Sequence, residues 1–311
     1  MKLKSQGEIM KMLFGTFPAM LTPYNKDFSI NADEYIKIAR FGIAQGLNGI
    51  FCNGSAGDGL ALSFEKKVEL MKLSLEAAQG KVPVISGIGS VIYEETIALA
   101  NEAKKLGLDA LLLQPPFYYP LSEENMIEYF SNIAKQVSLP LYIYNIPLFA
   151  PPISLKVAQK LSKIKNIVGM KDSAGSAVDF AHFSDVCDFD IFVGREEYYL
   201  GALLNGAKGS MTSCGCVFPE VMSGIYQSFL QKDYIKAQKL QKFILKAIRF
   251  AGTLPFPLGY ACLLEARGFN FNNVLSIHPI DSHILQNIEN KKQEAISIIK
   301  EMKEIVDLKD L

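Results

Sequence analysis

Lys171 is the residue of this sequence whose type and surroundings most directly suggest chemistry. It ends an apolar segment, residues 167–170, that has the character of a short buried strand. Burying an ammonium beside apolar side chains is costly, so a lysine in such a place favours its neutral form. A neutral amine is a nucleophile and condenses with a ketone to an imine. The alternative is a strand-end lysine whose stem packs on the protein while its ammonium reaches water.

Two further candidates follow other apolar segments of the same kind. Gly54-Ser55-Ala56-Gly57 comes directly after residues 49–52, and Tyr144 lies near the end of residues 141–145. Backbone N–H groups in such a turn, near a helix start, suit a carboxylate or a phosphate, although small residues are also common in ordinary turns. Tyr144 is either a phenol that transfers protons or a core tyrosine whose hydroxyl is bonded to the backbone.

Candidate contacts for a polar substrate lie in the last two apolar segments before residue 218. Glu196 and Glu197 follow one of them, and Met211 and Ser213 belong to the other. The two glutamates can hold sugar hydroxyls, or they can be the acidic residues that are common in the first turn of a helix. We include Glu196, Glu197, Met211 and Ser213 among the predicted substrate-binding residues.

The elements that must position these residues alternate regularly. Eight short apolar segments are each followed by a segment with helical spacing, which is typical of a parallel sheet. The predicted strands are residues 15–22, 49–52, 82–86, 111–113, 141–145, 167–170, 191–194 and 209–213. Eight units match a closed (β/α)8 TIM barrel, in which functional side chains lie at the C-terminal ends of the strands.

An open doubly wound sheet is the alternative fold. It predicts a glycine-rich dinucleotide-binding loop after the first strand, whereas the sequence there is Thr22-Pro23-Tyr24-Asn25. The helix that follows has a capping-box pattern, in which the side chains of Asn31 and Glu34 satisfy the first free N–H groups, and Gly46 ends it. Later helices are predicted at residues 63–78, 92–103, 122–136, 155–162, 176–186 and 198–205.

After residue 218 only helical patterns occur, at residues 219–230, 233–250, 257–267 and 284–306. The first can serve as the eighth barrel helix, and the others form an appendage. The sequence therefore predicts two parts: a (β/α)8 catalytic barrel with a short N-terminal leader over residues 1–231, and a C-terminal helical appendage over residues 232–311.

Composition restricts the partners. Lys and Arg number 32, as do Asp and Glu, so the formal charge is zero and no basic block suggests nucleic acid or an anionic membrane. The leader has no continuous apolar core and is not expected to be a signal peptide, and no apolar run approaches the roughly 18 residues of a membrane span. Because Cys214-Gly215-Cys216 supplies only two ligands, we predict no metal and interpret the five cysteines as reduced thiols of a cytoplasmic protein. His182, His278 and His283 are assigned no role.

Three motifs in register make the chain similar to a known family. Gly54-Ser55-Ala56-Gly57, Tyr144-Asn145-Ile146-Pro147 and Val168-Gly169-Met170-Lys171-Asp172 resemble, in order and spacing, those of the dihydrodipicolinate synthase and N-acetylneuraminate lyase family of class I aldolases. The resemblance extends from about Phe14 to the final helices. It implies a (β/α)8 barrel with C-terminal helices, a homotetramer, and pyruvate as the common substrate.

The resemblance also implies roles. Lys171 matches the Schiff-base lysine, Tyr144 the tyrosine that relays protons, and Ser55 with the backbone of Ala56 the pair that holds the pyruvate carboxylate. A protonated imine at C2 withdraws electrons, so that the C3–C4 bond can break while Tyr144 accepts the proton of the C4 hydroxyl. The iminium is itself the electron sink, so no cofactor is expected.

Three positions depart from the family pattern. Phe149 stands where dihydrodipicolinate synthases carry an arginine that grips a carboxylate, which argues against that activity because a phenyl ring cannot form such a grip. Ala56 replaces the second hydroxyl residue of its motif. Phe117, next to Tyr118, stands where a neighbouring subunit usually lends a tyrosine. The hydroxyl relay is therefore incomplete, which leaves open a homologue that binds pyruvate without turnover.

The remaining motifs favour a polyhydroxylated 2-keto acid. The Tyr144-to-Phe149 segment and the loop at residues 114–120 are similar to archaeal-type 2-keto-3-deoxygluconate aldolases, while Glu196, Glu197 and Ser213 fall where sialic acid lyases hold the hydroxylated tail. We therefore predict a class I aldolase that cleaves or forms a 2-keto-3-deoxy sugar acid with pyruvate as one partner. Two competing hypotheses are an N-acetylneuraminate lyase and a purely structural barrel in which Lys171 does not react.

Overall fold

The computed structural model describes residues 13–119, 121–271 and 276–305. The predicted leader lies outside these ranges, as do residue 120 of the predicted loop and residue 306 of the last predicted helix.

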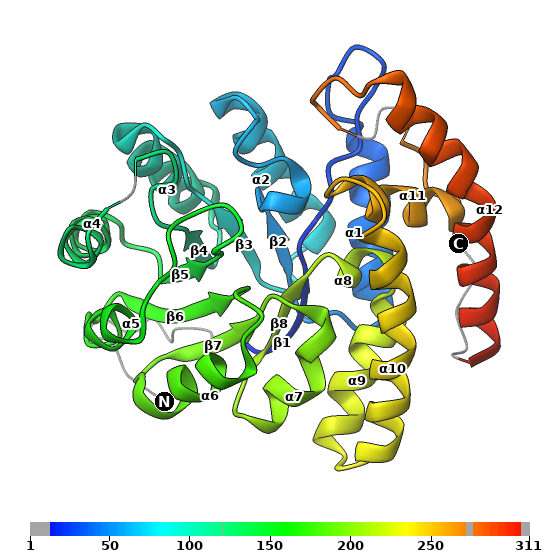
Figure 1. The fold of residues 1–311 in the computed structure, drawn as a ribbon. Helices are drawn as coiled ribbons and strands as arrows, with labels where there is room; N and C mark the ends of the chain where they lie inside the picture. The colour runs from blue at the N-terminus through cyan, green and yellow to red at the C-terminus, as the bar shows by residue number, and fades with distance from the viewer. Residues whose placement is uncertain (1–12, 120, 272–275, 306–311) are drawn as a thin grey trace.

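Eight parallel strands form a barrel in which, from β2 to β8, each strand pairs with the next one along the chain (Figure 1). The strands are β1 Gly15–Pro18, β2 Ile50–Cys52, β3 Val84–Gly87, β4 Ala110–Leu113, β5 Leu141–Asn145, β6 Ile167–Asp172, β7 Asp190–Val193 and β8 Gly209–Thr212. β8 pairs with β1, and a bridge between Ala19 and Phe51 joins the first two strands. The predicted (β/α)8 barrel is confirmed, and the open doubly wound alternative is wrong.

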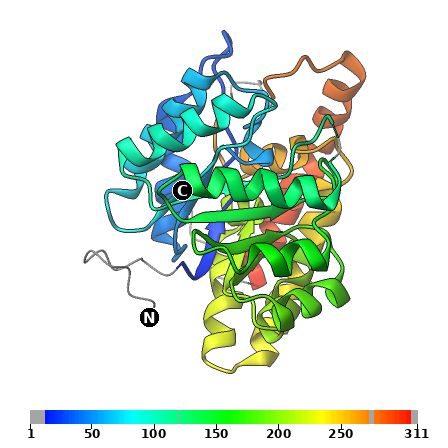
Figure 2. The ribbon, with the colours of Figure 1, turned by 90° about the vertical axis from the view of Figure 1, so that its left-hand side faces the viewer.

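Helices surround the strands (Figures 1 and 2). In Figure 2 the cyan and green helices from α3 to α6 lie in front of the strands. The barrel helices are α1 Ala32–Ala44, α2 Phe64–Ala78, α3 Tyr93–Leu106, α4 Glu123–Gln136, α5 Leu155–Leu161, α6 Ala177–Val186, α7 Tyr199–Leu204 and α9 Pro219–Leu230.

Three short elements were not predicted, and each begins soon after a strand. They are the 3-10 turns η1 Ser55–Gly57 and η2 Glu196–Tyr198 and the short helix α8 Cys214–Val217. All three contain candidate site residues or begin directly after one. These short elements fix backbone positions at the carboxyl ends of β2, β7 and β8.

The predicted capping box at the start of α1 is half confirmed. The side chain of Asn31 accepts a hydrogen bond from the N–H of Glu34 at 3.2 Å, as its residue type predicts. The carboxylate of Glu34 does not complete the box, because it accepts from the N–H of Asn270 at 2.8 Å and so binds the segment after α11. Gly46, with φ of +92°, follows the end of α1 in the left-handed conformation that favours glycine.

Strands β1 and β6 differ in length from the prediction. β1 ends at Pro18 rather than at residue 22, because the chain then turns toward Phe51 of β2, whose C=O accepts from the N–H of Met20 at 2.9 Å. β6 continues through Lys171 to Asp172, since both residues pair with β5 and with β7. Lys171 therefore lies in the wall of the barrel and not in the loop after it.

The C-terminal helices pack on one side of the barrel. They are α10 Tyr234–Ala251, α11 Leu258–Ala266 and α12 Ser282–Ile305, of which α12 is outermost (Figure 1). α10 packs against α7 and α9, and α11 against α8. Directly after α11, buried Arg267 donates two hydrogen bonds to the carboxylate of buried Glu220, at 3.1 and 2.8 Å, and ties the appendage to the start of α9. The domain division after residue 231 stays a prediction.

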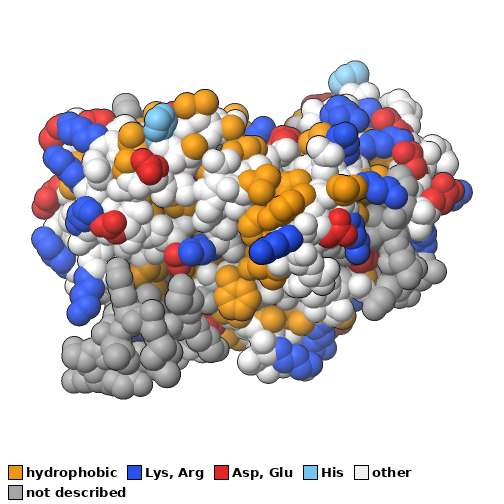
Figure 3. All heavy atoms as spheres, turned by 90° about the horizontal axis from the view of Figure 1, so that it is seen from below, with side chains coloured by type: hydrophobic (Ala, Val, Ile, Leu, Met, Phe, Trp, Pro, Cys, Tyr) orange, Lys and Arg blue, Asp and Glu red, His pale blue; other side chains and the backbone are white. Residues whose placement is uncertain are grey.

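The surface carries mixed charges and several exposed apolar side chains. Figure 3, seen from below the view of Figure 1, shows hydrophobic side chains gathered near the middle of that face. Exposed apolar residues on the helices include Val178 of α6, Leu204 of α7, Leu230 of α9 and Ile235 of α10. Within the described ranges, no helix is both long enough and apolar enough to cross a membrane.

Candidate active site

A cavity of about 120 Å³ opens at the C-terminal ends of the strands, between the barrel and the first turn of α11. All eight residues predicted for the site line this cavity: Ser55, Ala56, Tyr144, Lys171, Glu196, Glu197, Met211 and Ser213. They come from η1, β5, β6, η2, β8 and the residue after β8, which are distant in sequence. The parallel barrel brings them together because it directs every strand end to one face.

Lys171 is held inside the cavity wall. The residue is only 4% exposed, and its Nζ lies 4.2 Å from the ring centre of Tyr144 and 4.9 Å from that of Phe51. These contacts place the amine over two aromatic faces rather than in open water. Gly194 leaves the space that the side chain needs, since a Cβ at that position would lie 2.8 Å from Cε of Lys171. The arrangement suits an amine that receives a ligand from the cavity.

Tyr144 lies beside Lys171 by strand register. The two residues are direct partners in the β5–β6 pairing, so their side chains extend from neighbouring strands toward the same interior. Tyr144 is buried, and its hydroxyl accepts a long hydrogen bond of 3.5 Å from Oγ of Ser173. Ser173 also lines the cavity, although it was not among the predicted site residues. Its position two residues after Lys171 was the available signal, because alternate residues of an extended chain share a face.

A buried polar pair supports the ends of β5 and β6. Nδ2 of Asn145 donates to Oδ1 of Asp172 at 2.7 Å, and Oδ1 of Asn145 accepts from the N–H of Ile153 at 3.0 Å. Asn145 and Asp172 directly follow Tyr144 and Lys171 and are themselves register partners. Their hydrogen bond therefore fixes the two strands at the level of the amine and the phenol. We expect both residues to act as positioning residues.

Burial raises the pKa of Asp172 from its ordinary value of 3.8 to about 6, although hydrogen bonds from Ala174 and Asn145 act in the opposite direction. The folded protein therefore takes up a proton near pH 6, whereas the unfolded chain does so only near pH 4. Stability from this group is gained as pH falls and is lost as pH rises through about 6.

We predict that the free energy of unfolding of the wild type, relative to Asp172→Asn, rises by about 1 kcal/mol between pH 7.5 and pH 5. The asparagine keeps an oxygen that can accept the two hydrogen bonds but cannot titrate. Urea unfolding at a series of pH values measures the difference. Asp185→Asn, on an exposed carboxylate of α6, is the control and should show no such slope. A flat difference for Asp172→Asn would contradict the prediction.

The Gly54-Ser55-Ala56-Gly57 turn presents backbone donors at one edge of the cavity. The N–H of Gly57 donates to the C=O of Gly54 at 3.1 Å, and that of Asp58 to Ser55 at 3.4 Å. Among the hydrogen bonds of the described residues, the N–H groups of Ser55 and Ala56 have no protein partner. Gly57 has to be glycine, since a Cβ there would lie 2.5 Å from the C=O of Met20. The turn can therefore offer two amides and one hydroxyl to an anion.

The two glutamates have different surroundings. Glu196 is buried, and its Oε1 accepts from the N–H of Cys214 at 3.0 Å, which joins η2 to the start of α8. Burial raises the pKa of Glu196, while the hydrogen bond from Cys214 opposes this rise. Glu197 is more exposed and accepts from Nη2 of Arg195 at 3.2 Å. Of the two carboxylates, Glu197 is the freer to contact a ligand.

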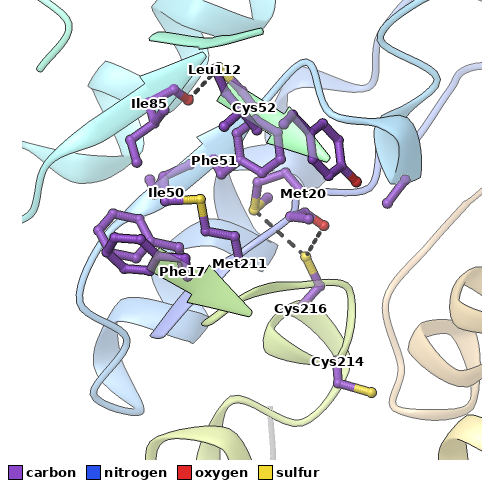
Figure 4. Close-up of a cluster of buried hydrophobic side chains, with 14 of the residues drawn as sticks. Phe17, Met20, Ile50, Phe51, Cys52, Ile85, Leu112, Met211, Cys214 and Cys216 are labelled. Atoms are coloured by element: carbon purple, nitrogen blue, oxygen red, sulfur yellow. Dashed lines mark hydrogen bonds between the residues drawn. The ribbon is translucent and has the colours of Figure 1, made fainter. Parts of the chain in front are cut away.

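Met211 belongs to the apolar floor of the cavity. Met211 is completely buried, and Figure 4 shows it among Phe17, Ile50 and Phe51 of the barrel interior. Sγ of Cys216 donates to the C=O of Ala19 at 3.3 Å, and the sulfur of Cys214 points away from it (Figure 4). All five cysteines are free thiols, as predicted. Within the described ranges, no group of three His, Cys, Asp or Glu side chains could hold a metal ion.

Three aromatic residues at the outer side of the cavity were not among the predicted site residues. Phe149 belongs to the loop after β5, Phe256 to the segment before α11, and Tyr260 to α11 itself. Burial and the charge of Glu196 raise the pKa of Tyr260 well above its ordinary value, so its hydroxyl stays a donor. No periodicity in the sequence indicates that the appendage reaches the barrel mouth.

Comparison with known proteins identifies the family. A model of the dihydrodipicolinate synthetase family matches residues 12–300. A 4-hydroxy-tetrahydrodipicolinate synthase of Bartonella bacilliformis is 30% identical over 295 residues, which are 93% of this chain and 100% of the relative. A DapA-like lyase of Pyrococcus abyssi is 29% identical over 293 residues, covering 89% of this chain and 99% of the relative.

A solved structure shows the same architecture. The chloride-inhibited dihydrodipicolinate synthase of Acinetobacter baumannii, complexed with pyruvate, superposes with a TM-score of 0.84 at 27% identity. The match covers 91% of this chain and 99% of that one. The likeness therefore extends over barrel and appendage together.

Proposed function

Because the chain belongs to the dihydrodipicolinate synthetase family of pyruvate-dependent carbon–carbon lyases, we propose that it is a Schiff-base aldolase of 2-keto-3-deoxy sugar acids. The observation that carries the proposal is the buried Nζ of Lys171, 4.2 Å from the ring centre of Tyr144 in a cavity of small-molecule size. An amine in that position can condense with the C2 ketone of a 2-keto acid and expel water.

The proposed cleavage uses Lys171 and Tyr144 in sequence. The iminium at C2 draws the electrons of the C3–C4 bond as that bond breaks. Tyr144 takes the proton of the C4 hydroxyl on its phenol oxygen while its own proton passes to water, so the aldehyde leaves. The enamine then takes a proton at C3, and water hydrolyses the iminium to release pyruvate and Lys171. Ser55 with the amides of Ser55 and Ala56 holds the pyruvate carboxylate throughout.

The polar side of the cavity supports a hydroxylated substrate tail. Glu197, Ser213 and Ser173 line that side and can exchange hydrogen bonds with hydroxyl groups. Glu196 helps to position α8, because one of its carboxylate oxygens accepts a hydrogen bond from the N–H of Cys214. N-acetylneuraminate lyase activity is the second candidate, favoured by the same three polar contacts and tested by the same assay of pyruvate release.

A non-catalytic pyruvate-binding homologue is a further candidate, favoured by Ala56 and Phe117. It predicts an imine with pyruvate but no release of pyruvate from any 2-keto acid. We also propose that the protein is a cytoplasmic homotetramer. Tyr118 and Tyr119 support this assembly, because they are 74% and 76% exposed in the loop after β4. Phe117 of that loop lines a second cavity, which adjoins the site at Ser55 and Tyr144. A mass near four times 34.4 kDa in light scattering is expected, and a monomer would contradict it.

Borohydride trapping tests the proposed function. Pyruvate and borohydride together should convert Lys171 to a stable secondary amine, which peptide mass spectrometry locates. Pyruvate release from 2-keto-3-deoxygluconate, N-acetylneuraminate and unsubstituted 2-keto acids then ranks the substrates. Lys67, the other buried lysine of the described chain, serves as internal control because its Nζ is paired with Glu95 at 2.9 Å. An unmodified Lys171 would refute the mechanism.

A further inference from the structure

The outer side of the cavity is an aromatic wall, formed by Phe149, Phe256 and Tyr260. The rings of Phe149 and Phe256 have centres 6.0 Å apart, and those of Phe256 and Tyr260 lie 6.2 Å apart. Barrel and appendage thus build one continuous surface that faces the same cavity as Lys171. Phe149 and Phe256 are 44% and 46% exposed, so a ligand can still cover much of both rings. Covering apolar surface in this way favours an apolar ligand group.

The charges of the cavity disfavour an anionic group at the same place. Of the described residues that line it, only Lys171 and Arg195 are cationic. Lys171 is used by the imine, and Arg195 donates to the carboxylate of Glu197 at 3.2 Å. The described lining of the adjoining cavity, which shares Phe149 and Tyr144, contains no charged residue. A carboxylate or phosphate on the leaving aldehyde would therefore meet Glu196, Glu197 and aromatic carbon.

We propose that this site has a further activity, the aldol addition of pyruvate to uncharged aromatic aldehydes, with the aryl group against the aromatic wall. The inference rests on the proposed function, because it needs the pyruvate enamine at Lys171. It goes beyond that function because the wall, and not the polar side at Glu197 and Ser213, selects the aldehyde. The product is a 4-aryl-4-hydroxy-2-oxo acid.

The step balances without any further reagent. Pyruvate and Lys171 form the iminium with loss of water, and transfer of a C3 proton to water gives the enamine. The enamine electron pair forms the new bond to the aldehyde carbon as the carbonyl π bond breaks. The aldehyde oxygen takes a proton from the hydroxyl of Tyr144. Tyr144 regains its proton from water, which had received the one from C3. Water then hydrolyses the iminium, which frees Lys171 and releases the product.

The test compares aldehydes that differ in one property, with the full chain and pyruvate. Benzaldehyde and 4-carboxybenzaldehyde share the ring and differ in charge, so their kcat/KM values should differ by at least about tenfold in favour of benzaldehyde. Phe149→Ala and Phe256→Ala should each lower the ratio of kcat/KM for benzaldehyde to that for glyceraldehyde by about tenfold. Chromatography with mass detection quantifies the products.

Phe14→Ala is the matched control. Phe14 is 56% exposed and directly precedes β1, at the opposite end of the barrel, so its loss should leave the ratio unchanged. Borohydride trapping of pyruvate on each variant shows whether the fold and the imine are intact. Imine formation without benzaldehyde addition, or equal ratios in all three variants, would overturn this inference alone. No imine on the wild type would overturn the proposed function and the inference with it.

Discussion

Replacing Lys171 by alanine should lower kcat/KM for pyruvate release by at least about a thousandfold and abolish borohydride trapping. In the proposed mechanism the amine nitrogen of Lys171 bonds to the substrate, so its removal eliminates the covalent route and not merely a contact. The substitution also leaves a space beside Gly194, whose missing Cβ already makes room for the lysine stem. Pyruvate release, trapping and thermal unfolding of the variant are the measurements. A loss below about tenfold in a folded variant would contradict the covalent role.

The comparison with Lys67 shows why burial alone does not make a lysine a nucleophile. Lys67 is as buried as Lys171, but its ammonium lies 2.9 Å from the carboxylate of Glu95. That carboxylate holds the Lys67 ammonium in an ion pair, and Lys67 does not line the cavity that Lys171 lines. Among the salt bridges of the described residues, none involves Lys171. Lys135→Ala, at an exposed position of α4, should leave both activity and trapping unchanged and serves as the control variant.

The part of the site that could be predicted follows from strand geometry. Lys171, Tyr144, Ser55 and Ser213 lie in or after apolar segments of a parallel barrel, and the C-terminal ends of all strands meet on one face. Their convergence therefore needed only the strand pattern. β6 extends two residues beyond its predicted end at residue 170. This difference does not change the predicted position of Lys171 at the C-terminal end of the strand.

The rest of the site depends on contacts between segments that are far apart in the sequence. The spacing of apolar residues does not reveal such contacts. The aromatic wall joins Phe149 to Phe256 and Tyr260, which are separated from it by the later barrel units and by the whole of α10. The packing of α11 against α8 brings these aromatic side chains together. A helical pattern in the sequence predicts a helix but not the neighbour against which the helix packs. Glu34 is a second example. The sequence predicts that its carboxylate caps the start of α1, but the carboxylate instead accepts a hydrogen bond from the N–H of Asn270, which is distant in the sequence.

The second large effect is expected from Tyr144→Phe, which removes one oxygen and keeps the ring. The aromatic face that lies 4.2 Å from Nζ of Lys171 remains, so pyruvate should still form its imine and be trapped by borohydride. The proton of the C4 hydroxyl loses its acceptor, and general acid–base groups contribute typically about 10²–10⁴-fold to rate. We therefore expect kcat for cleavage to fall by about 10²–10⁴-fold.

The separation of trapping from turnover makes this substitution more informative than a loss of activity alone. Tyr142→Phe is the control, because Tyr142 lies two residues earlier on β5 and packs against Phe192, one layer below the cavity. Its turnover should stay within about threefold of the wild type, since no reacting atom is near. If Tyr144→Phe also kept its turnover while imine formation was normal, the proton would have to pass through another hydroxyl. Ser173, the group bonded to the Tyr144 phenol, would then be the acceptor, and Ser173→Ala would carry the loss instead.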